Sequence, residues 1–189
     1  MRHRITASTF AAVCCLSIAA CTGSDDRSTP QPRPRSTLKL GQSADTAGVG
    51  GRGAAQITPD TVVYADSTSF ATPEHGLFAV VNYQSRNRTK SHVTTTAEQG
   101  GLRWKAADGH TVTARNSKAA TKVAPIGFSE GGPVFTSETG HQDVAVFDIA
   151  PAERGGTLIY VDGDGTAFRW KIPASNSGSA VPALKFALS

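Results

Sequence analysis

Cys21 carries the clearest chemistry in this sequence, because it stands where an apolar N-terminal run stops. The chain begins Met1-Arg2-His3-Arg4 and then has no charged residue up to Ala20. A basic start, an apolar middle and a small-residue exit are typical of a secretory signal peptide. A thiol can supply a nucleophilic sulfur at this boundary. We expect cleavage between Ala20 and Cys21, which removes residues 1–20.

The segment Ile18-Ala19-Ala20-Cys21 resembles the lipobox of bacterial lipoproteins, whose cysteine receives a thioether-linked diacylglycerol before cleavage. The resemblance implies a lipid anchor, including palmitate-like chains, on Cys21 at the outer face of the cell membrane. Two acyl chains hold a protein stably, at about 0.8 kcal/mol per buried methylene. Cys14 and Cys15 would leave with the signal, so no disulfide framework can form. An ordinary secretory signal with an incidental cysteine, and an uncleaved anchor, are the alternatives.

Residues 21–36 are expected to be a disordered tether that follows the lipidated cysteine. From Thr22 to Ser36 the sequence has no aliphatic or aromatic side chain and three prolines, so it cannot form a core. An extended tether of this length would reach on the order of 45 Å. Loss of Arg2 and Arg4 lowers the basic residues from 19 to 17 against 15 acidic ones. This balance does not suggest a nucleic-acid partner.

Ser129 is the candidate nucleophile of a catalytic interpretation. Gly127-Phe128-Ser129-Glu130-Gly131 matches the G-x-S-x-G pattern of α/β-hydrolases, which needs a strand that turns sharply into a helix. Gly132 and Pro133 follow at once, and no alternating βα pattern surrounds the motif. In an alignment to chymotrypsin-like proteases, Glu130 would take the nucleophile's place, where a carboxylate cannot act. We therefore favour a glycine-rich loop, with a small hydrolase as the alternative.

Metal-binding patterns are weak in this sequence. The histidines beyond the signal are far apart: His75, His92, His110 and His141. None is paired with another at metal-ligand spacing. Asp162 and Asp164 match part of a calcium loop, but the third acidic ligand and the later glutamate are missing. The sequence predicts surface histidines, a hairpin turn, and neither metal nor cofactor.

A basic stretch at 85–92 alternates cations with small polar residues. If it is extended, period two places four basic side chains on one side: Arg86, Arg88, Lys90 and His92. This basic ladder could bind an anionic wall polymer or phospholipid headgroups, with an affinity that falls as salt rises. We favour another role, since charged residues on an edge strand prevent edge-to-edge pairing.

The folded part is predicted to be one all-β domain over residues 37–189. Its apolar segments are short, rich in β-branched and aromatic residues, and separated by Gly, Asp, Asn and Pro. A flexible Gly-rich loop is expected at 41–55. Since no window of a dozen residues shows helical spacing, we expect a sandwich of about eight or nine strands. The expected strands are 38–40, 56–64, 77–84, 102–106, 111–115, 122–126, 144–149, 157–161 and 167–172.

Two hairpins are expected from Asp108-Gly109 and from Asp162-Gly163-Asp164-Gly165, each between two alternating runs. The runs Leu-Arg-Trp-Lys-Ala at 102–106 and Phe-Arg-Trp-Lys-Ile at 168–172 repeat one pattern. Period two places the tryptophans in the core and the cations on the opposite faces. The residues concerned are Trp104 and Trp170 on the core side, and Arg103, Lys105, Arg169 and Lys171 on the other.

The lipobox, the Pro-rich tether and three strand segments together resemble a known family. The segments are GGLRWKAADG, VAVFDI and GGTLIYVDGDGTAFRW. The chain is similar to small secreted lipoproteins of actinobacteria that carry a telokin-like, immunoglobulin-type domain, over roughly residues 38–188. The resemblance implies an immunoglobulin-like antiparallel β-sandwich without the usual inter-sheet disulfide. It implies no binding residues, because the family is functionally obscure.

We expect a non-catalytic binding or interaction module with a monomeric domain, displayed outside the cytoplasmic membrane. Its expected partners are the membrane, through diacylglycerol on Cys21, and an anionic wall polymer or an envelope protein. One alternative is a small extracytoplasmic hydrolase that uses the Ser129 loop. Another is an accessory solute-binding lipoprotein, which is less favoured because solute receptors close two domains around a hinge.

Overall fold

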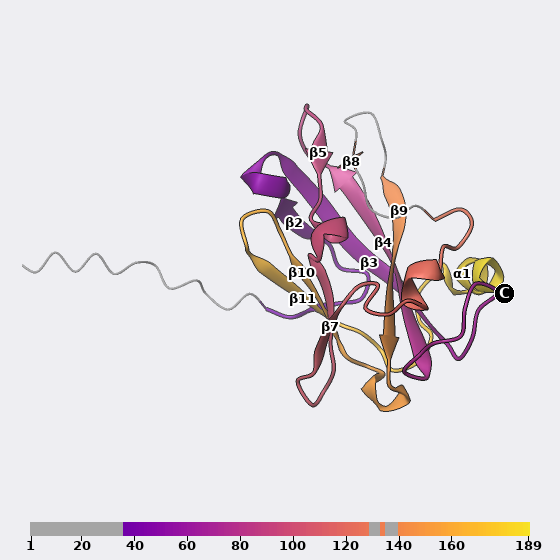
Figure 1. The fold of residues 1–189 in the computed structure, drawn as a ribbon. Coiled ribbons are helices and arrows are strands. Elements are labelled where there is room, and N and C mark those ends of the chain that lie inside the picture. The colour runs from indigo at the N-terminus through magenta and orange to yellow at the C-terminus, as the bar shows by residue number, and fades with distance from the viewer. Residues whose placement is uncertain (1–35, 129–132, 135–139) are drawn as a thin grey trace, which may run out of the picture. The chain divides into compact units, whose positions relative to one another are not determined.

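The computed structural model of the protein describes residues 36–128, 133–134 and 140–189 (Figure 1). The predicted signal segment, Cys21, the tether up to residue 35 and Ser129 lie outside the described residues. The chain is mostly β, with two larger sheets, and antiparallel pairing dominates.

One sheet has five strands in the order β1-β11-β10-β6-β7. Its strands are β1 (Leu38–Lys39), β6 (Leu102–Lys105), β7 (Thr111–Thr113), β10 (Thr157–Val161) and β11 (Ala167–Lys171). Only β1 and β11 run parallel in this sheet. Both predicted hairpins are confirmed, since the turn at 108–109 joins β6 to β7 and the turn at 162–165 joins β10 to β11.

The other large sheet has the order β2-β3-β4-β9 and is antiparallel throughout. Its strands are β2 (Ala44–Ala47), β3 (Ala54–Ala65), β4 (Leu77–Asn87) and β9 (His141–Ile149). A separate pair joins β5 (Val93–Thr94) to β8 (Pro133–Val134). The helical elements are the 3-10 turns η1 (Val49–Gly51), η2 (Ala97–Gln99), η3 (Ala120–Lys122) and η4 (Pro151–Glu153), and the helix α1 (Val181–Leu188).

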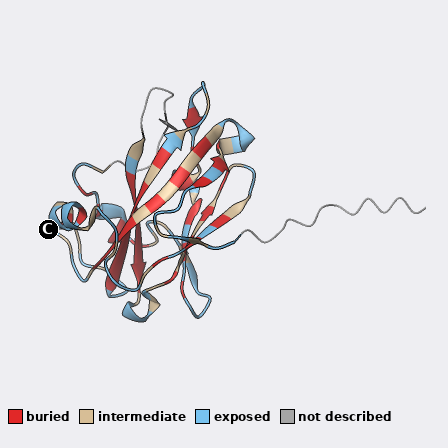
Figure 2. Ribbon diagram, turned by 180° about the vertical axis from the view of Figure 1, so that it is seen from behind, coloured by how far each residue is buried: buried red, intermediate tan, exposed pale blue. Residues whose placement is uncertain are grey.

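Strand β4 is buried on both faces, which explains its apolar run at 77–81. Leu77, Val81 and Tyr83 pack into the core between the two large sheets. Phe78 and Val80 pack on the opposite face with residues of η3 and α1. Alternate side chains of a strand point to opposite faces, so a strand covered on both sides needs apolar residues at successive positions. Figure 2 shows the buried residues concentrated along the strands.

The predicted tryptophan core is confirmed. Trp104 and Trp170 have 1% and 0% of their surface exposed, and the four cations beside them are exposed. The Trp104 ring lies 5.8 Å from the Phe147 ring and 6.3 Å from the Tyr64 ring, measured between centroids. Phe147 and Tyr64 belong to the four-stranded sheet, so these contacts join the two sheets, each with about 0.5–1.5 kcal/mol beyond area burial.

Three local predictions were wrong. The predicted loop at 41–55 contains β2 and η1, because Thr46 Oγ1 donates a 2.9 Å hydrogen bond to the Ala55 carbonyl across a short strand pair. The predicted strand at 122–126 is irregular, and Val123 instead packs on the outer face of the four-stranded sheet. Helix α1 was not predicted, because its eight residues are shorter than the window in which helical spacing was sought.

Candidate functional site

The basic ladder does not lie on an edge strand. Arg86 belongs to β4, which pairs with β3 on one side and with β9 on the other. The interpretation of these charges as protection of a sheet edge was therefore wrong. It rested on local alternation, whereas the position of a strand within a sheet depends on partners that are distant in sequence.

The ladder is also not one straight row. Strand β4 ends at Asn87, whose side-chain oxygen accepts a 2.8 Å hydrogen bond from the Thr89 backbone N–H. The Asn87 side-chain amide donates at 2.6 Å to the Ser91 carbonyl. These bonds fold the chain into a turn, so period two does not hold beyond the strand. All four basic side chains are exposed, and their binding to an anionic polymer stays a prediction: Arg86, Arg88, Lys90 and His92.

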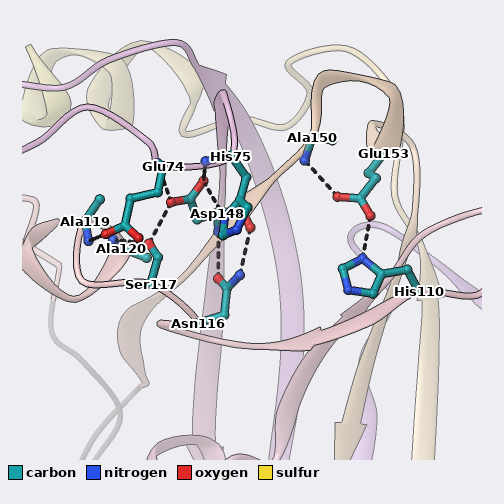
Figure 3. A network of polar contacts seen from close by, with 10 residues as sticks. All are labelled: Glu74, His75, His110, Asn116, Ser117, Ala119, Ala120, Asp148, Ala150 and Glu153. Carbon is teal, nitrogen blue, oxygen red and sulfur yellow. Dashed lines mark hydrogen bonds and ion pairs between the residues drawn. The ribbon is translucent and has the colours of Figure 1, made fainter.

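A serine, a histidine and an aspartate do meet in the structure, away from the Ser129 motif (Figure 3). Ser117 Oγ donates to the buried Asp148 carboxylate at 2.6 Å, and His75 Nδ1 lies 3.4 Å from the other carboxylate oxygen. In a catalytic triad the histidine lies between the serine and the carboxylate and takes the serine proton. Here the carboxylate lies in the middle. This arrangement cannot generate a serine nucleophile through the histidine.

The Asp148 network instead holds two loops against β9. The Asp148 carboxylate also accepts the backbone N–H groups of Glu74 at 2.7 Å and His75 at 2.9 Å. The Asn116 side chain bonds the Asp148 backbone on both sides, donating to the carbonyl at 2.7 Å and accepting from the N–H at 2.8 Å. Ser117 Oγ in turn accepts the Ala120 N–H at 2.9 Å at the start of η3. Each carboxylate oxygen of Asp148 is hydrogen-bonded, as a buried carboxylate requires.

The chain crosses from one sheet to the other directly before this network, at Ala114 and Arg115. The Ala114 N–H donates to the Leu102 carbonyl on β6, and the next N–H, of Arg115, donates at 2.7 Å to the Val146 carbonyl on β9. The crossing gives Arg115 a φ of 61°, a left-handed value that no other non-glycine residue in the described part of the chain adopts. Such a conformation costs about 1–2 kcal/mol. The bonds of Asn116 and Ser117 to β9 hold it in place.

A cavity of about 380 Å³, the Tyr83 cavity, lies beneath this crossing. It is lined from β4, β9, η2, β6 and the crossing by these residues: Tyr83, Ala97, Glu98, Gly100, Leu102, Ala114, Arg115, Val144 and Ala145. Polar groups form the larger part of the cavity surface, and the charged side chains of Glu98 and Arg115 are exposed. A concave site that combines apolar side chains with polar groups of opposite charge is a candidate small-ligand site.

Tyr83 is the polar group inside the cavity. Only 2% of its surface is exposed. Burial is the largest cause that raises the pKa of Tyr83 well above 10.0, followed by the negative charge of Asp143, while Arg115 lowers it. The phenol therefore stays protonated at neutral pH. It can donate a hydrogen bond to a ligand, but it is not a base there.

Asp143 adds a buried negative charge next to Tyr83. The two residues are direct partners across the β4 and β9 pair, and Asp143 is 2% exposed. One of its carboxylate oxygens accepts a hydrogen bond from Ser85 Oγ at 2.9 Å. The charged side chains that line the cavity itself are Glu98 and Arg115.

Asp162, the first aspartate of the turn that matches part of a calcium loop, has a structural role. Asp162 accepts the backbone N–H groups of Ala47, Asp164 and Thr166 at 2.9, 3.1 and 2.8 Å. It therefore closes the hairpin turn and joins it to β2. Within the described ranges, no group of three His, Cys, Asp or Glu side chains is placed to hold a metal ion.

The described histidines lie mostly at the surface. His75, His92 and His110 are exposed, as predicted, and His141 at the start of β9 is half-buried. His110 Nδ1 lies 2.7 Å from the Glu153 carboxylate, and this hydrogen bond is the main cause that raises the pKa of His110.

Sequence reasoning missed the cavity residues. Tyr83, Glu98 and Arg115 are well separated in the sequence and meet only because of the crossing between sheets. The one local signal was Asp148, a carboxylate within the apolar run of β9, which indicates a buried network. No residue type in the stretch around Arg115 predicts a left-handed arginine.

No helix within the described ranges is long and apolar enough to span a membrane. No protein-family model matches the chain, and no curated protein matches it. Among solved structures, the chain is similar to a conserved hypothetical protein from Bacillus anthracis, with 15% sequence identity and a TM-score of 0.42. The similarity covers 68% of this chain and 96% of that chain. A similarity at this level establishes neither the type of fold nor the function.

Proposed function

We propose that this chain is a lipid-anchored lipoprotein of the cell envelope, of the telokin-like, actinobacterial kind, whose domain is a non-catalytic binding module. The segment at 18–21 supports the anchor on Cys21, and the Pro-rich composition of 22–36 supports a tether. Two large sheets with a tryptophan core between them agree with an immunoglobulin-like sandwich. The domain from residue 37 onward has no cysteine, so this sandwich has no inter-sheet disulfide.

The Tyr83 cavity carries the proposal of binding. It combines a tyrosine that is almost fully buried with an arginine in a strained conformation. Strained residues concentrate at sites of function. A ligand in the cavity would accept a hydrogen bond from the Tyr83 hydroxyl, and its contact with Arg115 would explain the strain.

The same residues favour binding over catalysis. The Tyr83 phenol is not a base at neutral pH, and the Ser117 hydroxyl donates a hydrogen bond to the Asp148 carboxylate. A hydrolase needs a nucleophile, a base and an oxyanion stabiliser within reach of one another. Those roles are not assembled around the cavity by the residues that line it.

The binding proposal can be tested by thermal denaturation of the full chain in detergent micelles with the small-molecule fraction of an envelope extract. We expect the fraction to raise the Tm of the wild type, because a ligand of the folded state stabilises it. Tyr83→Phe should remove this rise, and the matched control Lys105→Gln, on an exposed face, should keep it. An equal rise for wild type and Tyr83→Phe, or no rise at all, would contradict the proposal.

The anchor is tested separately in cells of the source bacterium. The wild type should incorporate labelled fatty acid and sediment with membranes, and Cys21→Ala should do neither. Cys14→Ala is the matched control, because this residue lies in the segment that cleavage removes. Unchanged labelling of Cys21→Ala would refute the anchor without bearing on the cavity.

A further inference from the structure

We propose that the outer face of the five-stranded sheet binds the surface of a bilayer that contains anionic phospholipids. The contact is made by five cations, which we call the cationic face: Lys39, Arg103, Lys105, Arg169 and Lys171. None of them lines the Tyr83 cavity. The choice of a bilayer as the partner rests on the proposed lipid anchor, whereas the face follows from strand register and exposure.

The register of the strands gathers these cations into two rows. One row crosses β6, β10 and β11 and consists of Arg103, Ile159 and Arg169. The other crosses the same strands and β1, and consists of Lys105, Thr157, Lys171 and Lys39. Neighbouring strands lie about 4.8 Å apart, and alternate residues of one strand lie about 7 Å apart. The Cα positions of the five cations therefore span about 14 by 7 Å.

The cations point away from the core. Trp104 and Trp170 alternate with them along β6 and β11 and are buried between the sheets, so the side chains beside the tryptophans point to the other face. All five cations are exposed. The five strands of this sheet contain no Asp or Glu. No carboxylate on these strands therefore offsets the charge of the cationic face.

The stability of the fold does not explain this concentration of charge. Lys39 and Lys171 are direct partners on neighbouring strands, and like charges at opposite positions destabilise a sheet. Charges on an edge strand can prevent edge-to-edge pairing, but β6 and β11 each pair on both sides and hold four of the five cations. An anionic partner explains both observations.

A hollow beside the cationic face favours a lipid over a water-soluble polyanion. It has a volume of about 710 Å³ and a mostly apolar surface, and Leu40, Ile172 and Pro173 line it. Its charged lining residues are Lys39, Arg154, Lys171 and Asp60. An anionic phospholipid combines a phosphate for the cations with apolar chains, which gain free energy when they leave water.

The chain enters the domain at this same sheet. Strand β1 is the first strand of the chain, and it carries Lys39. If Cys21 is lipidated, as proposed, residues 22–36 link the bilayer to this strand. A flexible linker of this length has an end-to-end distance of about 20 Å, which gives the bilayer a high effective concentration at the face. The membrane is therefore the anionic surface that the face meets most often.

Lysine acetylation measures the contact on the full chain reconstituted into vesicles. The vesicles consist of phosphatidylcholine alone or of equal parts of phosphatidylcholine and phosphatidylglycerol, and mass spectrometry gives the labelling rate of each lysine. We expect Lys39, Lys105 and Lys171 to react at least about fivefold more slowly on the anionic vesicles, because each cation near such a surface gains about fivefold in binding. Sodium chloride at about 1 M, where the Debye length is about 3 Å, should restore the labelling.

Three exposed lysines on other elements are the internal controls. Lys118, Lys122 and Lys185 lie in or beside η3 and α1, which pack on the outer face of the four-stranded sheet. Their labelling rates should be the same on both kinds of vesicle. Equal slowing of both sets of lysines, or slowing of neither, would overturn the cationic face as a docking surface.

Polyphosphate distinguishes a soluble polymer from the bilayer. On phosphatidylcholine vesicles, at the same phosphate concentration, it should protect the three lysines of the cationic face less than phosphatidylglycerol does. The reason is that polyphosphate has no apolar part and is not held near the face by the tether. Equal or stronger protection by polyphosphate would overturn the assignment to a lipid.

The double variant Arg103→Gln with Arg169→Gln removes two charges and keeps every labelled lysine. We expect about 25-fold weaker docking, seen as loss of protection of the lysines of the cationic face. Lys118→Gln with Lys122→Gln removes the same net charge near η3 and should keep the protection. The double arginine variant should also keep the Tm of the wild type in neutral micelles, as surface substitutions usually do. A clear fall in Tm would assign these charges to the fold.

Lys105→Gln separates the cationic face from the Tyr83 cavity. It should reduce the protection of Lys39 and Lys171 on anionic vesicles. It should keep the rise in Tm with the small-molecule envelope fraction, because Lys105 does not line the cavity.

Failure of this inference is distinguishable from failure of the proposed function. Sedimentation with phosphatidylcholine vesicles tests the anchor, because these vesicles carry no net charge. If the chain sediments with them but the lysines of the cationic face are not protected on anionic vesicles, the anchor stands and the docking surface falls. If the chain sediments only with anionic vesicles and the double arginine variant does not, the cationic face stands and the anchor falls.

Discussion

The Asp148 network and the Tyr83 cavity lie on either side of one chain crossing, and they treat buried polar groups in opposite ways. Asp148 is 1% exposed, and its two carboxylate oxygens accept three hydrogen bonds from Ser117 and from two backbone N–H groups. Tyr83 is 2% exposed, and it lines the cavity. The two residues are almost equally buried. The degree of burial alone therefore does not tell whether a polar group serves the structure or the function.

The difference lies in what each group would lose. Removal of a bonded carboxylate leaves several donors without an acceptor, and each buried donor left unpaired costs about 1–3 kcal/mol. Removal of the Tyr83 hydroxyl, from a residue that lines the cavity, leaves no comparable set of unpaired donors. We infer that the network stabilises the crossing and that the cavity keeps its bonding capacity for a ligand.

Asp148→Ala should cause the largest loss of stability. It leaves the N–H groups of Glu74 and His75 and the Ser117 hydroxyl without their acceptor. We expect the free energy of unfolding, measured by urea denaturation, to fall by about 3–5 kcal/mol. Asp164→Asn, at an exposed aspartate, is the control and should change it by less than about 0.5 kcal/mol. A fall below about 1 kcal/mol for Asp148→Ala would break the comparison.

Arg115→Gly should separate stability from binding at the crossing itself. Glycine adopts a φ near 61° without strain, so we expect the free energy of unfolding to rise by about 1 kcal/mol. The rise in Tm with the envelope fraction should be lost together with the guanidinium. The pair of measurements is urea denaturation and thermal denaturation with the envelope fraction, on the same preparation. A variant that is less stable than the wild type would show that Arg115 is held for structure.

Tyr83→Phe should leave the stability at neutral pH within about 0.5 kcal/mol of the wild type, although it removes binding. The alkaline range then sharpens the comparison. The pKa of Tyr83 is raised above its unfolded value of 10.0, so the unfolded chain releases this proton first. The stability contributed by the neutral phenol is complete below about pH 10 and is lost as the pH rises further.

Urea denaturation as a function of pH measures this effect. Tyr83→Phe should lose less stability above about pH 10 than the wild type. Some loss should remain, because burial also raises the pKa of Tyr64, which the variant retains. If the free energy of unfolding fell equally with pH in the two proteins, the burial of the Tyr83 phenol would not raise its pKa.

The sequence predicted the parts of the fold that depend on near neighbours. The hairpins β6–β7 and β10–β11 follow from Asp-Gly turns between alternating runs, and Trp104 and Trp170 follow from period two. These signals need only a few consecutive residues. The short strand β2 and the helix α1 gave too little pattern to be predicted.

The candidate site could not be predicted in the same way. Arg86 was assigned to an edge strand because the pairing of β4 with β9 joins residues more than fifty positions apart, such as Ser85 and His141. The cavity needs this pairing and also the left-handed Arg115, for which the residue type gives no signal. The charge of Asp148 within an apolar strand was visible, but its partners were not.

The pair of His110 and Glu153 gives the smallest expected effect and tests whether burial is what makes the Asp148 network matter. His110 Nδ1 and the Glu153 carboxylate are 2.7 Å apart at the surface. The hydrogen bond to Glu153 and then its charge raise the pKa of His110. The stabilisation from this pair is complete below about pH 6.5 and is lost as the pH rises through the raised pKa of the folded state.

Glu153→Gln removes the charge and keeps an oxygen for the Ala150 N–H, which donates to Glu153 at 2.8 Å. We expect the pKa of His110, followed by NMR titration, to return toward its ordinary value, with only a small change in the free energy of unfolding, because exposed ion pairs stabilise little. Asp164→Asn, at an exposed aspartate, is the control and should leave the pKa of His110 as it is in the wild type. A loss of stability comparable to that of Asp148→Ala would show that hydrogen-bonded carboxylates matter here whether or not they are buried, and the contrast between network and surface would fail.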